Sequence, residues 1–123
     1  QMQALVRRIP AADYVIRYAL RLTRWTRPVS WDAHAAVPKD VPDYVRQYVT
    51  WGAGPRAGQN LVLAAKGRAL LHGRHHVAVE DIQAVALPVL RHRIITNYAA
   101  KADNVTPDDL IRRLLRDVPA RTA

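Results

Sequence analysis

Proline and glycine residues restrict the fold of this chain more than any other feature of its sequence. Eight prolines and five glycines interrupt its 123 residues. The longer segments between them carry apolar residues at the three- and four-residue spacing of helices. No segment predicts a sheet. We therefore expect an all-α fold, a small helical bundle of about four to five helices.

The boundaries of the expected helices follow from local signals. The helices are expected at residues 10–25, 41–49, 55–72, 80–92 and 106–118. Loops are expected at 28–40 and 96–105. The middle of the helix expected at 55–72, residues 61–65, is apolar on every side, which is typical of the buried centre of a bundle, and Gly73 marks the C-terminal stop of this helix. Thr106 offers a capping hydroxyl before Pro107 at a first helical position.

Two of these segments have further features that bear on packing. Tyr14, Tyr18, Leu22 and Trp25 fall on one stripe of the first helix, so we expect them in the core. Pro88 lies inside the helix expected at 80–92 and should kink it or remove one hydrogen bond.

The composition predicts a globular protein without a membrane-spanning segment. Half of the residues are hydrophobic and 24% are charged, which is compatible with a folded core. Cysteine is absent, which excludes disulfides and thiolate metal sites and suits a reducing compartment. No apolar run approaches the roughly 18 residues that span a bilayer, and residues 1–8 do not resemble a signal peptide. We expect a cytoplasmic piece of a longer protein.

The net charge is the one unusual bulk property. Nineteen Lys and Arg residues against ten Asp and Glu residues give +9, and the isoelectric point is near 10.8. Such a surface attracts phosphates, anionic lipid headgroups or an acidic protein face, and the charge alone does not choose among them.

The segment before the longest expected helix is the best candidate for a site. It contains Trp51, Gly52, Ala53, Gly54 and Pro55, followed by Arg56. The glycines permit a sharp approach, and proline fixes the first helical turn. Arg56 then lies near the positive end of the helix dipole, where its planar guanidinium could meet a phosphate. The alternative is a solvated arginine in an ordinary helix-starting loop.

Several segments together resemble the MoxR-type AAA+ ATPases. Residues 48–59, YVTWGAGPRAGQ, are similar to the family's Y-V-x-W-G-A-[SG]-P-R-A segment. In the same order follow AAKGRALLHGR at 64–74, VEDI at 79–82, ALPVLRHR at 86–93 and VTPDDL at 105–110, and TRP at 26–28 precedes them. The resemblance covers roughly residues 10–119.

The resemblance implies a C-terminal lid domain at residues 10–119, after a linker at 1–9 from an ATPase core and before a tail at 120–123. Arg56 matches the family's sensor 2 arginine, which reaches the γ-phosphate of ATP on its own or a neighbouring subunit. The parent would bind ATP and Mg²⁺, form a ring, expected to be a hexamer, and act as a chaperone or assist metal insertion and complex assembly. This fragment alone would not hydrolyse ATP.

Other catalytic and metal-binding patterns are weak or missing. No G-x-x-x-x-G-K-[ST] loop occurs, so the chain lacks its own phosphate cradle. We interpret Glu80 and Asp81 as helix-start acids rather than magnesium ligands. A cluster of histidines at 72, 75 and 76 is interpreted as a polar helix end rather than a metal site. The only serine, Ser30, has no partners for a nucleophilic triad.

Arginines form the candidate partner surface. Arg17, Arg21 and Arg24 recur at helical spacing on the first helix, and Arg91 and Arg93 belong to the ALPVLRHR segment. Three readings stay open: a solvated face, a contact with an acidic protein domain, or a basic helical nucleic-acid-binding module. The family resemblance makes nucleic acid the less expected partner.

Overall fold

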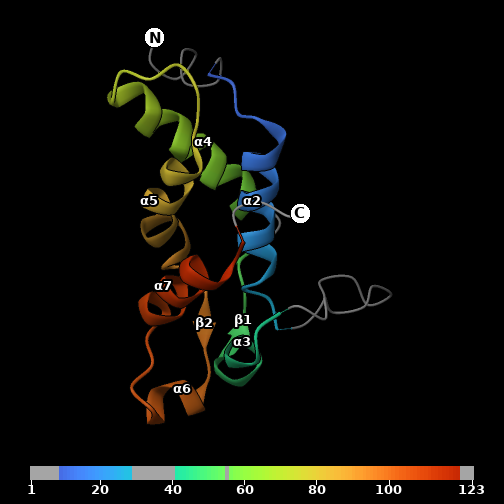
Figure 1. The fold of residues 1–123 in the computed structure, drawn as a ribbon. Helices are drawn as coiled ribbons and strands as arrows, with labels where there is room; N and C mark the ends of the chain where they lie inside the picture. The colour runs from blue at the N-terminus through green and yellow to red at the C-terminus, as the bar shows by residue number, and fades with distance from the viewer. Residues whose placement is uncertain (1–8, 29–40, 55, 120–123) are drawn as a thin grey trace.

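The computed structural model describes residues 9–28, 41–54 and 56–119. Its elements, labelled as in Figure 1, are α2 (Asp13–Arg24), α3 (Asp43–Tyr48), β1 (Val49–Trp51), α4 (Ala57–Leu71), α5 (Val79–Leu90), β2 (Ile95–Thr96), α6 (Tyr98–Ala102) and α7 (Pro107–Asp117). The expected all-α bundle is confirmed.

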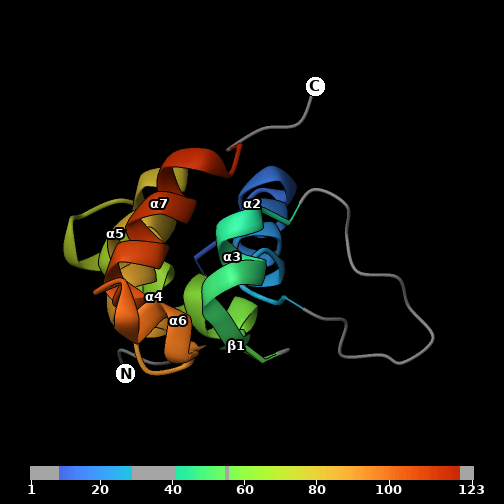
Figure 2. The same cartoon turned by 90° about the horizontal axis from the view of Figure 1, so that it is seen from below.

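Helix α4 joins the two sides of the bundle. It packs against α5 on one side and α2 on the other, and α7 packs against α5. Figure 2, seen from below, shows α5 and α7 on one side and α2 and α3 on the other. The shared core contains Tyr18 and Leu22 from α2, Leu61 from α4, Ile82 from α5 and Ile111 from α7, all with no exposed surface. These apolar side chains hold the helices together.

The ends of α4 and α7 follow the sequence signals. Gly73 has φ +73°, the Arg74 N–H donates to the Ala69 carbonyl at 2.8 Å, and the Gly73 N–H donates to the Leu70 carbonyl at 3.0 Å. This is the hydrogen-bond pattern of a Schellman cap. At α7, the Thr106 hydroxyl accepts from the Asp109 N–H at 3.1 Å, as the predicted N-cap requires.

A small antiparallel ribbon replaces part of the expected loops. Strand β1 pairs with β2, with Val49 opposite Thr96 and Trp51 opposite Ile95, and the register is irregular between the two pairs. The expectation of no sheet was wrong here. The strands have three and two residues, so neither is long enough to produce a readable alternation.

The segment 96–105, expected to be a loop, contains α6. Asn97 caps this helix, because its side-chain oxygen accepts from the Ala100 N–H at 3.0 Å. The alanine-rich sequence then supports one short turn of helix. A helix of five residues is too short for a periodic pattern, which explains why the sequence did not reveal it.

The N-terminal end of α2 also differs from the expectation. The helix starts at Asp13 rather than at Pro10. The Pro10 carbonyl instead accepts a hydrogen bond from the Val77 N–H at 3.1 Å, beside an isolated parallel bridge between Ala11 and Val77. The chain before α2 is thereby tied to the connector between α4 and α5, which keeps it extended.

Two expectations about burial need correction. Tyr18, Leu22 and Trp25 are buried as predicted, but Tyr14 is 39% exposed, because the buried face of α2 passes through the neighbouring Val15, which has no exposed surface. Helix α4 is not buried on every side: Leu63 is 42% and Leu71 75% exposed. Pro88 is exposed and α5 continues through it to Leu90, where the missing N–H is tolerated on the solvent side.

Candidate functional site

The turn before α4 is held against the end of α2. Thr26 Oγ1 accepts a hydrogen bond from the Ala53 N–H at 2.8 Å, and Arg27 Nε donates to the Ala53 carbonyl oxygen at 2.8 Å. The Thr26 hydroxyl in turn donates to the Thr23 carbonyl at 2.6 Å. Ala53 is fully buried, and two consecutive residues satisfy both of its backbone polar groups. We call Thr26, Arg27 and Ala53 the turn anchor.

Gly52 makes the close approach of the turn anchor possible. A Cβ at this position would lie 2.3 Å from the Thr26 carbonyl oxygen and 2.7 Å from the Arg27 Cα, so only glycine fits. Gly54 is in open space, with no atom within 4 Å of an added Cβ, and its carbonyl accepts from the Ala57 N–H at 3.0 Å. The packing therefore requires the first glycine and not the second.

Arg56 lies at the start of α4, where the sequence predicts it. It is the N-cap residue, with φ −80° and ψ −12°, and it is exposed. In the part of the chain that the structure describes, its guanidinium has no hydrogen bond or ion pair. The first N–H groups of a 15-residue helix lie beside it, and such groups carry partial positive charge. This arrangement is suited to binding an anion. Pro55 lies outside the described residues.

The start of α5 carries the only buried charged side chain among the described residues, the carboxylate of Asp81. Asp81 has no exposed surface. Its Oδ1 accepts from Arg68 Nη1 at 2.6 Å and from Arg74 Nη2. Its Oδ2 accepts from Arg74 Nη1 at 2.7 Å and from the Ala78 N–H at 2.8 Å. We call Arg68, Arg74 and Asp81 the carboxylate cluster, and it links both ends of the α4–α5 connection.

The hydrogen bonds of the carboxylate cluster lower the pKa of Asp81. Burial alone would raise the pKa of this carboxyl, but the hydrogen bonds from Arg74, the Ala78 N–H and Arg68 outweigh burial and lower the pKa to about 2. Its four acceptor positions are all in use, so no lone pair remains for a metal ion. This geometry agrees with the interpretation of Asp81 as a helix-start acid. The sequence did not reveal its burial, since the partner Arg68 lies on another helix.

The arginines of the candidate partner surface fall into two groups. Arg17, Arg21 and Arg24 lie on α2 and line one depression together with Leu20, Thr23 and Arg27. Arg21 Nη1 also donates to the Pro119 carbonyl at 2.6 Å. Burial lowers the pKa of Arg27, and the nearby charge of Arg24 lowers it further.

The second group lies at the C-terminal end of α5. Arg91 forms two hydrogen bonds with Asp108, at 2.9 and 3.0 Å, and Arg93 Nε donates to the Val89 carbonyl at 3.1 Å. The structure does not bring these two residues to the α2 depression. Arg91 acts within the domain, because its planar guanidinium ties α5 to the first turn of α7.

Arginines of α7 have internal roles as well. The Arg113 guanidinium lies 4.2 Å from the centre of the Tyr44 ring, within the range of a cation–π interaction. The Tyr44 hydroxyl donates to Asp117 Oδ2 at 3.0 Å. Burial and the hydrogen bond to Asp117 raise the Tyr44 pKa above its usual range. These contacts hold α3, which precedes Ala53 of the turn anchor, against α7.

Metal ligands do not gather in the described residues. No group of three or more His, Cys, Asp or Glu side chains there could hold a metal ion, and the histidines at 72, 75 and 76 are exposed. Across the same residues, no helix has the length and apolar character needed to cross a membrane.

Known proteins resemble this chain over the region just described. A family model for the AAA lid domain matches residues 43–114. Chaperone MoxR1 of Mycobacterium tuberculosis is 40% identical over 74 residues, which is 60% of this chain and 20% of that protein. Protein MoxR of Methylorubrum extorquens is 42% identical over 74 residues, 58% of this chain and 21% of that protein. The chain thus spans about a fifth of these relatives.

A solved structure matches nearly the whole fold. The crystal structure of a proposed ATPase from Cytophaga hutchinsonii superposes with a TM-score of 0.81 and 30% sequence identity, and the match covers 94% of this chain and 33% of that chain. In that protein, an equivalent helical unit therefore forms one part of a chain about three times as long.

Proposed function

The chain belongs to the AAA lid domain family, as the lid region of a MoxR-type ATPase, and we propose that it closes over ATP bound to a core domain of the parent protein. In this proposal Arg56 is the sensor 2 arginine, the residue that contacts the γ-phosphate. ATP and Mg²⁺ are held by the core, and the lid contributes one positive charge to the phosphate that is transferred.

The position of Arg56 is the observation that carries the proposal. It is exposed at the N-terminus of the longest described helix, without a partner among the described residues. A cation held there can reach outward to a phosphate on another domain. A salt-bridged arginine such as Arg91 would first have to break two hydrogen bonds.

The turn anchor supports the same role. Because Ala53 is fixed through both backbone groups, the start of α4 keeps a defined position relative to the end of α2. A charge that is already positioned stabilises a transition state without reorganising when the reaction occurs. The lid would therefore sense the γ-phosphate by moving as one body with Arg56.

The wider biology of the parent is proposed from the relatives. We propose a soluble, cytoplasmic ring, hexameric in the simplest case, whose ATP hydrolysis drives chaperone-like work such as metal insertion or the assembly of protein complexes. The name of the Mycobacterium relative supports the chaperone part of this proposal. In such a ring, the partners of the lid are the core of its own chain and a neighbouring subunit.

The test is the Arg56→Ala variant of the intact ATPase. We expect ATP turnover at saturating ATP to fall at least about tenfold, because a positioned donor to a developing anion contributes that much or more. Arg56→Lys should retain part of the activity, since it keeps the charge but not the planar fork. Wild-type turnover and nucleotide affinity in Arg56→Ala would refute the assignment.

A control variant distinguishes a general loss of positive charge from the specific loss of Arg56. Arg112 is exposed on α7, and its side chain forms a 3.9 Å ion pair with Asp109. Arg112→Ala should leave turnover unchanged. Mixing Arg56→Ala subunits with subunits whose own core cannot hydrolyse ATP then tests where the arginine acts: activity recovered in mixed rings assigns it to a neighbour's nucleotide.

A further inference from the structure

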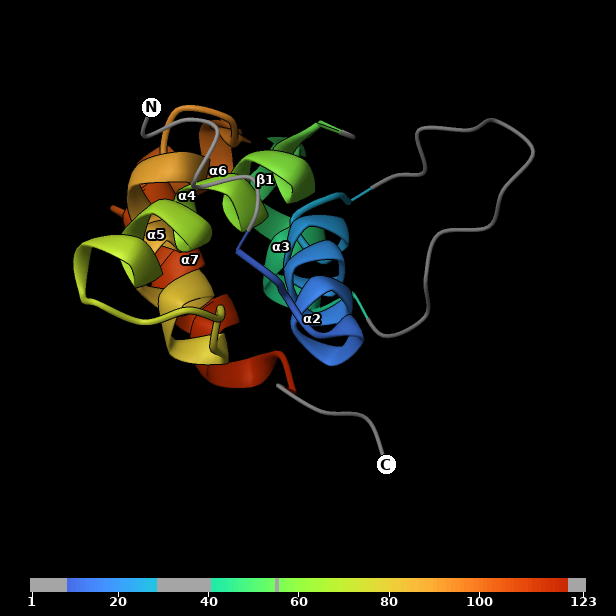
Figure 3. The same cartoon turned by 90° about the horizontal axis from the view of Figure 1, so that it is seen from above.

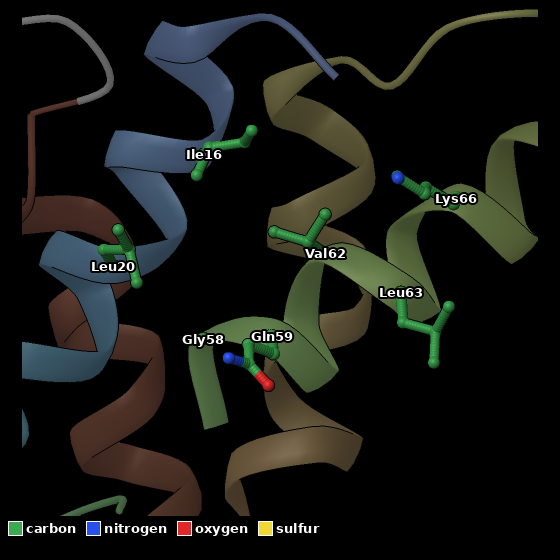
Figure 4. Close-up of a pocket in the computed structure, with 7 residues that line it drawn as sticks. All are labelled: Ile16, Leu20, Gly58, Gln59, Val62, Leu63 and Lys66. Atoms are coloured by element: carbon green, nitrogen blue, oxygen red, sulfur yellow. The ribbon is translucent and has the colours of Figure 1, made fainter. Parts of the chain in front are cut away.

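An apolar groove lies between α2 and α4, and Arg56 is not among the residues that line it. Ile16 and Leu20 of α2 form one wall, and Val62 and Leu63 of α4 form the other (Figure 4). The groove has a volume of about 340 Å³. Leu20 is 50% and Leu63 42% exposed, so large aliphatic side chains face solvent at its rim. Lys66 lies at the end of the α4 wall.

The shape of the groove follows from one close contact. A Cβ at Gly58 would lie 2.8 Å from Leu20 Cδ2, so α2 and α4 touch near the first turn of α4. From that point the two helices separate toward the C-terminal end of α4, as Figures 1 and 3 show. The space between them widens and is lined by aliphatic side chains from both helices.

The groove continues into a positively charged depression. The two share Leu20, and beyond it the depression has a volume of about 470 Å³ and is lined by arginines at positions 17, 21, 24 and 27. None of the described residues that line either part is acidic or aromatic. Arg21 and Arg27 each donate to a backbone carbonyl, whereas Arg17 and Arg24 are exposed, with no ion pair among the described residues.

We propose that this joint surface, the α2–α4 groove together with the arginine depression, binds an amphipathic helix of an acidic partner protein. The aliphatic side chains of the partner occupy the groove, and its carboxylates face Arg17 and Arg24. A groove between two helices accepts anchors at i, i+3, i+4 and i+7 of a third helix. Complementary charge beside the groove sets the orientation of that helix and speeds its association.

The apolar walls favour a protein over a nucleic acid. A nucleic-acid site gains its affinity from phosphate contacts and from stacking on aromatic rings. Here four aliphatic side chains line the groove, those of Ile16, Leu20, Val62 and Leu63, and no aromatic ring is among the described residues that line the joint surface. Exposed leucines gain binding energy only when an apolar partner covers them. Arg56 is not part of this joint surface, so binding of a helix there can be tested independently of the sensor 2 role.

The experiment measures binding of a synthetic helical peptide to the 123-residue chain. The probe is a fluorescent 18-residue peptide with Leu at anchor spacing and Glu on the flanking positions, followed by anisotropy at 150 mM salt. We expect saturable binding. A peptide with the same charge but Ala in place of Leu should bind at least about tenfold more weakly, because it cannot fill the groove. Equal binding of both peptides, or no binding of the Leu peptide, would overturn the proposal.

Matched variants locate the site. Leu63→Asp should weaken binding at least about tenfold, whereas Leu71→Asp, on the same helix but outside the groove and 75% exposed, should not. Reversing Arg17 and Arg24 to Glu should weaken binding, and the same reversal at Arg112 and Arg116 should not.

The arginine pairs change the net charge equally, so equal losses from both pairs would mean unspecific attraction and would refute the site. Duplex DNA of similar length serves as a competitor. Displacement of the peptide by DNA at lower concentration than by unlabelled peptide would assign the surface to nucleic acid instead. Circular dichroism of each variant checks that the fold is kept.

Discussion

Replacing Asp81 with Asn tests how much the carboxylate cluster contributes to stability. The lowering of the Asp81 pKa from 3.8 to about 2 corresponds to about 2 to 3 kcal/mol at roughly 1.4 kcal/mol per pKa unit. This is an upper figure, because the Arg68 and Arg74 side chains remain 33% exposed and water screens part of the attraction. Asn also keeps only one acceptor oxygen and turns an NH₂ group toward the donors, which costs about 1 kcal/mol more.

We therefore expect Asp81→Asn to lower the free energy of unfolding by about 3 kcal/mol at pH 7, in the range for breaking a buried ion pair. Urea unfolding followed by tryptophan fluorescence measures this as a lower midpoint with an unchanged slope. Asp108→Asn is the control. It removes a carboxylate that also binds an arginine twice, but at a partly exposed site, so its loss should be clearly smaller.

The pH dependence provides an independent check on Asp81. The folded pKa lies below the unfolded value, so the stabilisation is fully present above about pH 4 and is lost as the pH falls through about 2. The difference between wild type and Asp81→Asn should stay constant from pH 7 to pH 5 and shrink below pH 4. A loss under about 1 kcal/mol at pH 7, or a difference that already shrinks between pH 7 and 5, would refute the reasoning.

Three further predictions concern stability. Gly52→Ala should destabilise the chain by roughly 1–3 kcal/mol, because the added methyl would lie 2.3 Å from a backbone oxygen; Gly54→Ala should show much less change in the same urea titration. Thr106→Ala should cost about 1 kcal/mol through loss of the α7 N-cap, measured as a lower thermal midpoint, and Thr106→Ser should restore it. Tyr44→Phe should cost about 1 kcal/mol. The raised pKa of Tyr44 predicts that its phenol stays protonated at alkaline pH where an unshifted tyrosine ionises, and the absorbance difference between wild type and Tyr44→Phe separates this titration from those of Tyr18 and Tyr48, whose pKa is also raised.

The helices were predictable where the deciding contacts are local. Thr106 with Pro107, and Gly73 after an apolar run, define the ends of α7 and α4 through bonds within a few residues. The ribbon was not predictable in this way, because Val49 pairs with Thr96 across 47 positions of the chain. Strands this short carry no periodic pattern, and the α6 helix beside them depends on one Asn97 cap.

In the candidate site, too, the features that depend on local contacts were predictable and those that depend on distant contacts were not. The position of Arg56 at a helix start follows from the glycines and proline directly before it. The turn anchor does not, because Thr26 and Arg27 are 26 or more residues from Ala53 in the chain. The groove was missed for a different reason: the all-round apolar character of α4 was interpreted as complete burial. The same apolar pattern also fits a helix whose exposed face binds another protein.

The turn anchor and the groove share helix α2. Leu20 forms a wall of the groove, and Thr26 and Arg27, directly after the same helix, hold the turn that leads to Arg56. A displacement of α2 would therefore move the wall of the groove and the turn that leads to Arg56 together. If both proposals hold, thermodynamic linkage requires that a partner which tightens nucleotide binding is itself bound more tightly when nucleotide is present, by the same factor.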